Sequence, residues 1–155
     1  MKRLILFVAL IFAGYVASAQ DVGFGQGQSA GEEVNKEVKS SFTDKFPGVN
    51  MEEVEWGNEA DYHKAEFSMQ EKEYTAVFDQ EGKWISTETK NIPLDEVPKE
   101  VRDGFQETAY SDYNVNEIEK IESEDVTLYK MELRSGLRGT DLYLSEQGNI
   151  VRIDS

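Results

Sequence analysis

The sequence FDQEGKWI at residues 78–85 recurs as LSEQGNIV at residues 144–151, and this repeat decides the fold. Each stretch places strand-forming residues on both sides of a polar turn with glycine, which is the pattern of an antiparallel hairpin. Working outward, AEF at residues 65–67 matches MEL at residues 131–133 with the same displacement of 66 residues. The shared displacement predicts that the chain contains two tandem copies of one unit.

A helix is expected at the start of each copy. Apolar residues recur at every fourth position, as on one face of a helix, at Val34, Val38, Phe42 and Phe46. The same spacing recurs 67 residues later at Val101, Phe105, Ala109 and Tyr113. SAGE at residues 29–32 has the form of a capping box for the first helix, which Pro47 would end, and Pro98 suits the first turn of the second. Each copy is therefore expected to be a helix followed by about four antiparallel strands.

The two copies together predict an α+β fold with an antiparallel sheet of roughly eight strands. Consecutive short hairpins leave no room for crossover helices between strands, so the strands are expected to be antiparallel. The two helices are expected to pack on one face of this sheet. We place the first unit at residues 32–91 and the second at residues 92–155. Alternation assigns a core face to His63, Ala65, Phe67, Met69, Tyr74, Ala76, Phe78, Ile85, Tyr129, Met131, Leu133, Thr140, Leu142, Leu144, Val151 and Ile153.

The opposite, outer face mixes aromatic side chains with charges of both signs. It comprises Tyr62, Lys64, Glu66, Thr75, Val77, Trp84, Lys130, Glu132, Arg134, Asp141 and Tyr143. Such a face is either ordinary solvated surface or a recognition surface, because tyrosine, tryptophan and arginine dominate protein interfaces. The candidate binding residues are Tyr62, Lys64, Glu66, Trp84, Lys130, Arg134 and Tyr143. Trp84 belongs to the core instead if the strand register differs, since Ile150 takes its place in the second copy.

The N-terminal segment has the layout of a signal peptide. Lys2 and Arg3 precede an apolar run at residues 4–13, and ASA at residues 17–19 provides a cleavage site between Ala19 and Gln20. A retained anchor is the alternative, although ten apolar residues are about half of what spans a bilayer. Four glycines among residues 20–31 indicate a flexible leader. We therefore expect a periplasmic or secreted protein with no membrane insertion after cleavage.

The chain is strongly acidic, with 31 acidic and 16 basic side chains among 155 residues and a net charge of −15. This charge repels nucleic acid and anionic lipid, since binding to either depends on lysine and arginine. It would tolerate cationic partners or divalent ions, or it serves only to keep the domain soluble.

Residues suited to catalysis or to metal binding are scarce. The chain has no cysteine, and His63, its single histidine, lies among apolar strand residues, which favours a core position over a general base. One histidine does not make the usual zinc site. DQEG at residues 79–82 and SEQG at residues 145–148 lack the spacing of a calcium loop and are interpreted as hairpin turns. We expect a non-enzymatic protein without cofactor or metal.

Several motifs follow one another along the first copy: FPGV at residues 46–49, VEW at 54–56, Tyr62, AEF at 65–67 and FDQEGKW at 78–84. In this order they resemble the β-lactamase-inhibitor-like, PepSY-like family of exported bacterial proteins. The resemblance covers residues 33–153 as two copies; the second departs from the pattern where Tyr113-Asn114 replaces the Phe-Pro pair and where residues 136–139 lengthen a turn.

This resemblance implies a helix-and-sheet repeat like that of β-lactamase inhibitor proteins, which block an enzyme with the open face of their sheet. PepSY domains are thought to restrain peptidases or to act in the envelope. The family has no agreed functional residues. Two functions follow: a protein-binding module such as an enzyme inhibitor, with an unknown envelope or extracellular partner, or an acidic, cation-responsive or structural envelope protein.

Overall fold

The computed structural model describes residues 34–59 and 61–154. The expected signal peptide at residues 1–19 and leader at residues 20–31 lie outside the described residues, as does the SAGE capping box. No helix within the described residues combines the length and the apolar character needed to cross a membrane.

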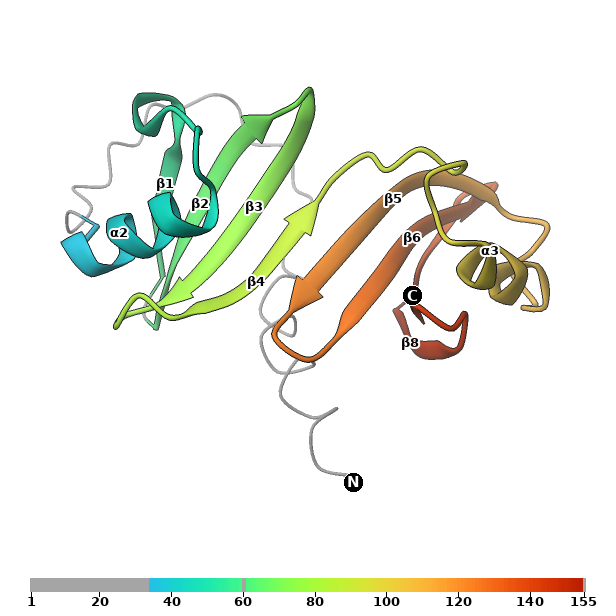
Figure 1. Ribbon diagram of the computed structural model, residues 1–155. Coiled ribbons are helices and arrows are strands. Elements are labelled where there is room, and N and C mark those ends of the chain that lie inside the picture. The colour runs from blue at the N-terminus through green and yellow to red at the C-terminus, as the bar shows by residue number, and fades with distance from the viewer. Residues whose placement is uncertain (1–33, 60, 155) are drawn as a thin grey trace. The chain divides into compact units, whose positions relative to one another are not determined.

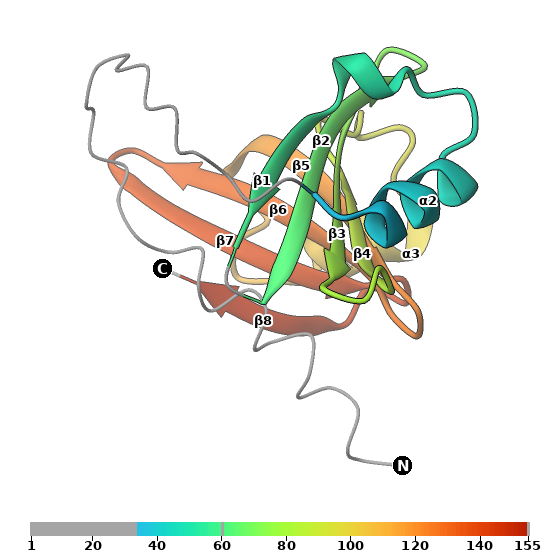
Figure 2. The same cartoon turned by 90° about the vertical axis from the view of Figure 1, so that its left-hand side faces the viewer.

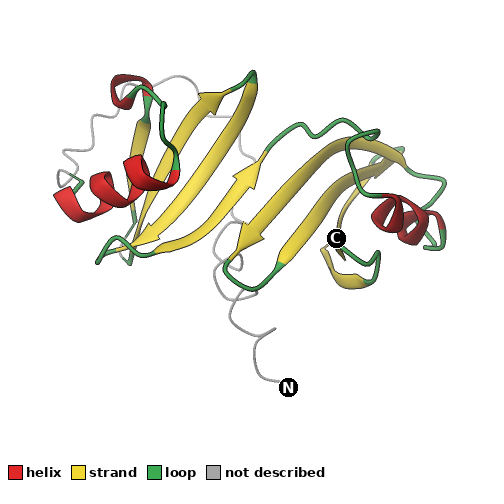
Figure 3. Ribbon diagram, in the orientation of Figure 1, coloured by secondary structure: helices red, strands yellow, loops and turns green. Residues whose placement is uncertain are grey.

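Eight strands of the described chain form one antiparallel sheet, and each strand pairs with its neighbours in sequence (Figure 1). The strands are β1 (Glu55–Asn58), β2 (Tyr62–Met69), β3 (Lys72–Asp79), β4 (Trp84–Thr89), β5 (Asn114–Ser123), β6 (Thr127–Ser135), β7 (Arg138–Ser145) and β8 (Ile150–Asp154). The helices are α2 (Lys36–Lys45), the short 3₁₀-helix η1 (Met51–Glu53) and α3 (Lys99–Gln106) (Figure 3). The helices α2 and α3 lie on the same face of the sheet (Figures 1 and 2). The predicted α+β fold is confirmed.

Both helices are shorter than their apolar stripes predicted. The first begins at Lys36, because the Asn35 side chain accepts a hydrogen bond from the Val38 amide at 2.8 Å. Asn35 is thus the N-cap, and the predicted cap at residues 29–32 is wrong. The second ends at Gln106: the Thr108 hydroxyl donates to the Phe105 carbonyl at 2.8 Å and accepts from the Tyr110 amide at 3.1 Å. These bonds satisfy a carbonyl of the last helical turn and an amide beyond it, and Ala109 and Tyr113 lie past the end of the helix.

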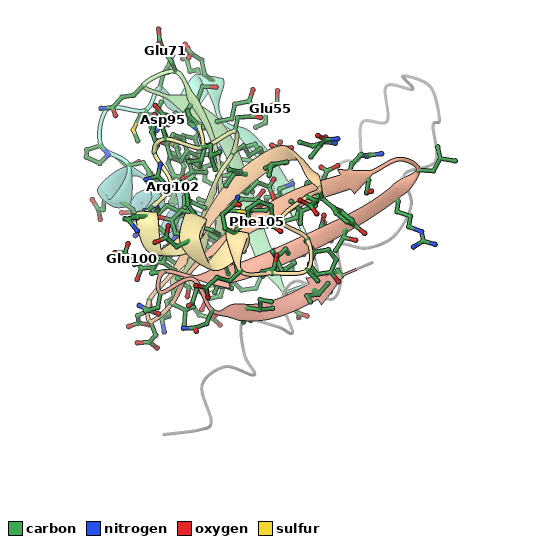
Figure 4. The ribbon with its side chains drawn as sticks, turned by 90° about the vertical axis from the view of Figure 1, so that its right-hand side faces the viewer. Glu55, Glu71, Asp95, Glu100, Arg102 and Phe105 are labelled. Atoms are coloured by element: carbon green, nitrogen blue, oxygen red, sulfur yellow. The ribbon has the colours of Figure 1, made fainter. Side chains whose placement is uncertain are left out.

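Each helix covers its own apolar core on the sheet. Phe42 of α2 is fully buried, and its ring centroid lies 5.0 Å from that of Phe67 and 6.3 Å from that of Phe78. The first core comprises Val34, Val38, Phe42, Phe46, Val54, Ala65, Phe67, Ala76 and Phe78. The second comprises Ile92, Val97, Val101, Phe105, Ile118, Tyr129, Met131, Leu133, Leu142 and Leu144. Phe105, which Figure 4 labels, lies between α3 and the strands.

A β-bulge in each copy corrects the predicted faces of the last strands. Phe78 pairs with Trp84 while Val77 pairs with Ser86, so Ile85 is an extra residue that shifts the alternation. Trp84 therefore shares the helix-covered face with Phe78 and packs against the first core. Its prediction as an outer-face residue is wrong, and the sequence alternative of a core position holds.

The second bulge lies between Tyr143 and Leu144, which pair with Arg152 and Ile150 and leave Val151 as the extra residue. Ile153 pairs with Leu142 on the core face, but β8 is the last strand of the sheet. Val151 and Ile153 are consequently 42% and 41% exposed, so their predicted burial in the core is wrong.

Candidate functional site

The outer face of the sheet, opposite the helices, carries six of the seven predicted binding residues. Tyr62, Lys64 and Glu66 lie on β2, where they alternate with the buried His63, Ala65 and Phe67. Lys130 and Arg134 lie on β6, and Tyr143 lies on β7. Trp84 is the exception. It is covered by the Lys45 side chain, whose Nζ lies 3.4 Å from the ring centroid on the helix side.

These six residues form two groups rather than one. On β2, Lys64 and Glu66 form an ion pair, and the hydrogen bond from Lys64 lowers the pKa of the Glu66 carboxyl. Lys130 and Tyr143 are cross-strand partners on β6 and β7, with β3, β4 and β5 between them and β2. Arg134 lies farther along β6, where its Nη2 donates to Glu132 at 3.1 Å. The structure thus separates a β2 group from a β6–β7 group.

Lys130 is fixed at the centre of the β6–β7 group by two carboxylates. Its Nζ lies 2.9 Å from a Glu119 oxygen and 3.5 Å from an Asp141 oxygen. Burial disfavours the charged form of Lys130, but the hydrogen bond to Glu119 and the charges of Glu119 and Asp141 outweigh that effect and raise its pKa. Arg152 of β8 lies with its Cζ 4.7 Å from the Tyr143 ring centroid and forms an ion pair with Asp154. Neighbouring charges therefore hold this group in place.

A pair of carboxyl groups lies where the two copies join on the outer face. Glu88 of β4 shares a hydrogen bond with Glu119 of β5. Burial, followed by the charge of Glu119 and this hydrogen bond, raises the pKa of Glu88 to about 7. Neither residue was predicted from the sequence. The alternation of Ser86 and Glu88 with Thr87 and Thr89 could have placed Glu88 on the outer face. The proximity of Glu119, in contrast, depends on the register between β4 and β5.

His63 occupies the predicted core face and is 6% exposed. Its Nδ1 lies 2.7 Å from the Asn58 side-chain oxygen, whereas Nε2 has no hydrogen-bond partner among the described residues.

The DQEG stretch forms a hairpin turn, as predicted, in which the Asp79 carboxylate accepts from the amides of Glu81 and Lys83. Within residues 34–59 and 61–154, no three histidine or acidic side chains are placed to hold a metal ion.

Comparison with known proteins identifies the relatives of this fold. A Bacteroides ovatus protein of the DUF2874 family has a solved structure with a TM-score of 0.73, at 21% identity over 80% of this chain and 89% of its own. A "BLIP-like" protein from Bacteroides fragilis gives a TM-score of 0.69, at 22% identity over 77% and 84%. A "putative periplasmic" protein from Bacteroides eggerthii gives 0.72, at 17% identity over 79% and 89%.

At these identities the likenesses show the fold alone. No curated protein sequence matches the chain. The family model described as "Putative beta-lactamase-inhibitor-like, PepSY-like" matches residues 61–152, which is more than half of the chain. Together with the helix-covered antiparallel sheet, this match shows that the chain belongs to the β-lactamase-inhibitor-like, PepSY-like family.

Proposed function

We propose that this chain is an exported, non-enzymatic protein-binding module that inhibits or restrains a partner protein through the outer face of its sheet. The observation that carries the proposal is the ordered mixture of charged and aromatic side chains on this face. Lys130 lies between Glu119 and Asp141, and Arg152 lies against Tyr143. The helices α2 and α3 lie on the other face (Figure 2).

Fixed side chains favour recognition because their conformational entropy is already lost before a partner arrives. The cross-strand pairs provide this fixation without a covering layer of helices. Tyrosine and arginine are also the residues that contribute most to protein interfaces. The family's inhibitor-like description and the BLIP-like relative support a protein as the partner. The periplasmic description of another relative supports an envelope location.

The test is affinity capture from an envelope extract of the parent organism. The bait is the immobilised chain from Gln20 onward, beside an outer-face variant carrying Tyr62→Ala, Lys64→Ala and Arg134→Ala. The matched control carries Lys36→Ala and Arg102→Ala on the helix-covered side, so that it removes two positive charges, as the outer-face variant does. Circular dichroism and thermal melts establish that all three baits are folded.

A protein retained by the wild type and by the control, but lost with the outer-face variant, is the expected result. Equal retention by all three baits contradicts the assignment to the outer face. If no bait retains a protein, the binding function itself is contradicted. The cation-responsive alternative is then tested by comparing melts in calcium and in sodium at equal ionic strength.

A further inference from the structure

The strand β8 forms one edge of the sheet, because the strand order of the described chain ends there (Figure 2). Three of its five residues, Ile150, Val151 and Ile153, are 48%, 42% and 41% exposed. An edge strand presents a row of backbone N–H and C=O groups that pair with no neighbour, and exposed apolar side chains beside them favour the addition of another strand. The side of β8 away from β7, its free edge, is therefore a candidate docking surface.

The opposite edge of the sheet lacks these features. β1 has only four residues, and its exposed residues are Glu55, Gly57 and Asn58. Its remaining residue, Trp56, packs against the first core. Short length and polar composition are common protections of an edge strand. Of the two edges, the free edge of β8 is consequently the one suited to strand addition.

The first copy shows what covers the equivalent edge. The displacement of 66 residues places Ser86 of β4 at Arg152 of β8. Both strands carry the same bulge, with Ile85 and Val151 as the extra residues. Directly after its bulge, β4 pairs antiparallel with β5 from Ser86 to Thr89. The bulge therefore leaves the edge able to accept a strand, and in β8 that edge has no strand beside it within residues 34–59 and 61–154.

A second copy of the chain is poorly suited to this edge. The strand that covers β4 is β5, whose pairing with β4 begins at Lys120. Lys120 pairs with Tyr129, whose equivalent in the first copy is His63. Because His63 pairs with Asn58, the equivalent of Lys120 is Asn58, where β1 ends. β1 thus lacks the stretch that would pair with β8. Two chains of net charge −15 also repel each other, whereas a basic segment is attracted.

We propose that the free edge of β8 binds an extended segment of a partner protein, antiparallel to β8, in which apolar residues alternate with polar residues that include lysine or arginine. In such strand addition, backbone hydrogen bonds provide affinity and the alternate side chains provide specificity. Ile150 and Ile153 pair with buried leucines of the second core, and so border the helix-covered face. Apolar side chains of the added strand would pack against them, while its basic side chains would lie on the outer face near Asp154.

This inference goes beyond the proposed function, because the free edge of β8 is a different surface from the outer face, and its test does not need the natural partner. The probe is the peptide acetyl-Thr-Lys-Ile-Thr-Val-Lys-Thr-amide, titrated into the ¹⁵N-labelled chain from Gln20 onward and followed by amide chemical shifts and hydrogen exchange. The control peptide, acetyl-Thr-Lys-Ile-Val-Thr-Lys-Thr-amide, has the same composition but places its two apolar side chains on opposite faces of a strand.

Two variants of the chain localise the binding. Ile153→Lys changes the edge itself, and Leu94→Lys introduces the same charge at another apolar residue, which is 51% exposed. Both positions are exposed, so both variants are expected to fold, which thermal melts verify.

With the alternating peptide, we expect saturable shifts and slower hydrogen exchange at the amides of residues 150–154. A nitroxide at the N-terminus of the peptide should broaden the amide signal of Asp154 more than that of Ile150, because the pairing is antiparallel. Ile153→Lys should lower the affinity at least about tenfold, which corresponds to 1.4 kcal/mol, whereas Leu94→Lys should retain most of it.

Equal binding of the two peptides, shifts that spare β8, the reverse order of broadening, or equal losses in the two variants would overturn the proposal. Sedimentation of the chain without peptide tests the other occupant. A dimer that Ile153→Lys dissociates would mean that a second copy covers the edge, and would also overturn the proposal.

The outcome is separable from that of the envelope capture. Peptide binding at β8, while capture fails, supports the edge and counts against the proposed function. Capture that depends on the outer face, without peptide binding at β8, removes the edge and leaves the proposed function.

Discussion

At the scale of single residues, Glu88 gives the chain a pH dependence of its own. Its folded pKa of about 7 lies above the ordinary value of 4.5, so the folded state binds this proton more tightly than the unfolded state does. The contribution of this proton to the free energy of unfolding is complete below about pH 4.5 and is lost as the pH rises through about 7. Because one pKa unit corresponds to about 1.4 kcal/mol and the pKa rises from 4.5 to about 7, the full loss is about 3 kcal/mol.

The variant Glu88→Gln should remove this loss, because an amide keeps a hydrogen bond to Glu119 without a titrating proton. Urea unfolding at pH 5 and at pH 8 measures the effect as the difference between the wild type and the variant, so groups common to both cancel. We expect the variant to gain stability relative to the wild type at pH 8. Glu146→Gln on the β7–β8 turn is the control. If the free energy of unfolding changes by the same amount between pH 5 and pH 8 in Glu88→Gln and in the wild type, the raised pKa of Glu88 is contradicted.

Trp84 and the pair of Glu88 and Glu119 show where sequence reasoning reached its limit. Alternation placed the residues of β2, β3 and β6 on the correct faces, because side chains of a regular strand alternate. It failed at Trp84, where a bulge sets two residues against one and shifts the alternation. It also missed the pair of Glu88 and Glu119, since their approach depends on the β4–β5 register between two segments that no local pattern aligns.

At the scale of elements, each helix is packed directly against the turn glycine of its own copy. A Cβ at Gly148 would lie 2.1 Å from the Glu100 carbonyl oxygen of α3, and a Cβ at Gly82 would lie 2.9 Å from the Glu37 backbone of α2. Both glycines also have positive φ, of +78° and +85°. The repeat of FDQEGKWI as LSEQGNIV thus preserves a helix–turn contact, in addition to the hairpin that the sequence predicted.

The variant Gly148→Ala should therefore destabilise the fold by about 3 kcal/mol or more, because it adds a backbone clash to the cost of the left-handed conformation. Gly136→Ala is the matched control. Gly136 has a φ of +62°, but a Cβ added there would meet nothing within 4 Å, so only about 1–2 kcal/mol is expected. Chemical denaturation measures both. Similar losses in the two variants would mean that α3 moves away from the turn at little cost.

At the scale of the whole described chain, two apolar cores are joined by a short and polar seam. The strands β4 and β5 pair over four residues, from Ser86 to Thr89. On the helix-covered face, this seam places Thr87 opposite Glu122 and Thr89 opposite Lys120, so apolar side chains do not bridge the cores there. The tandem repeat made the division into two cores predictable from the sequence. How strongly the unfolding of one core is coupled to that of the other depends on the side chains of the seam.

We predict that the two copies unfold as separable units. Phe42→Ala removes the centre of the first core and should cost about 3–5 kcal/mol, as for other buried phenylalanines. Hydrogen exchange in low denaturant should then show loss of amide protection in β2 and β3, while β6 and β7 keep theirs. Met131→Ala in the second core is the reciprocal variant and should show the reverse. Simultaneous loss of protection in all four strands in both variants would mean that the continuous backbone ladder couples the copies into one cooperative unit.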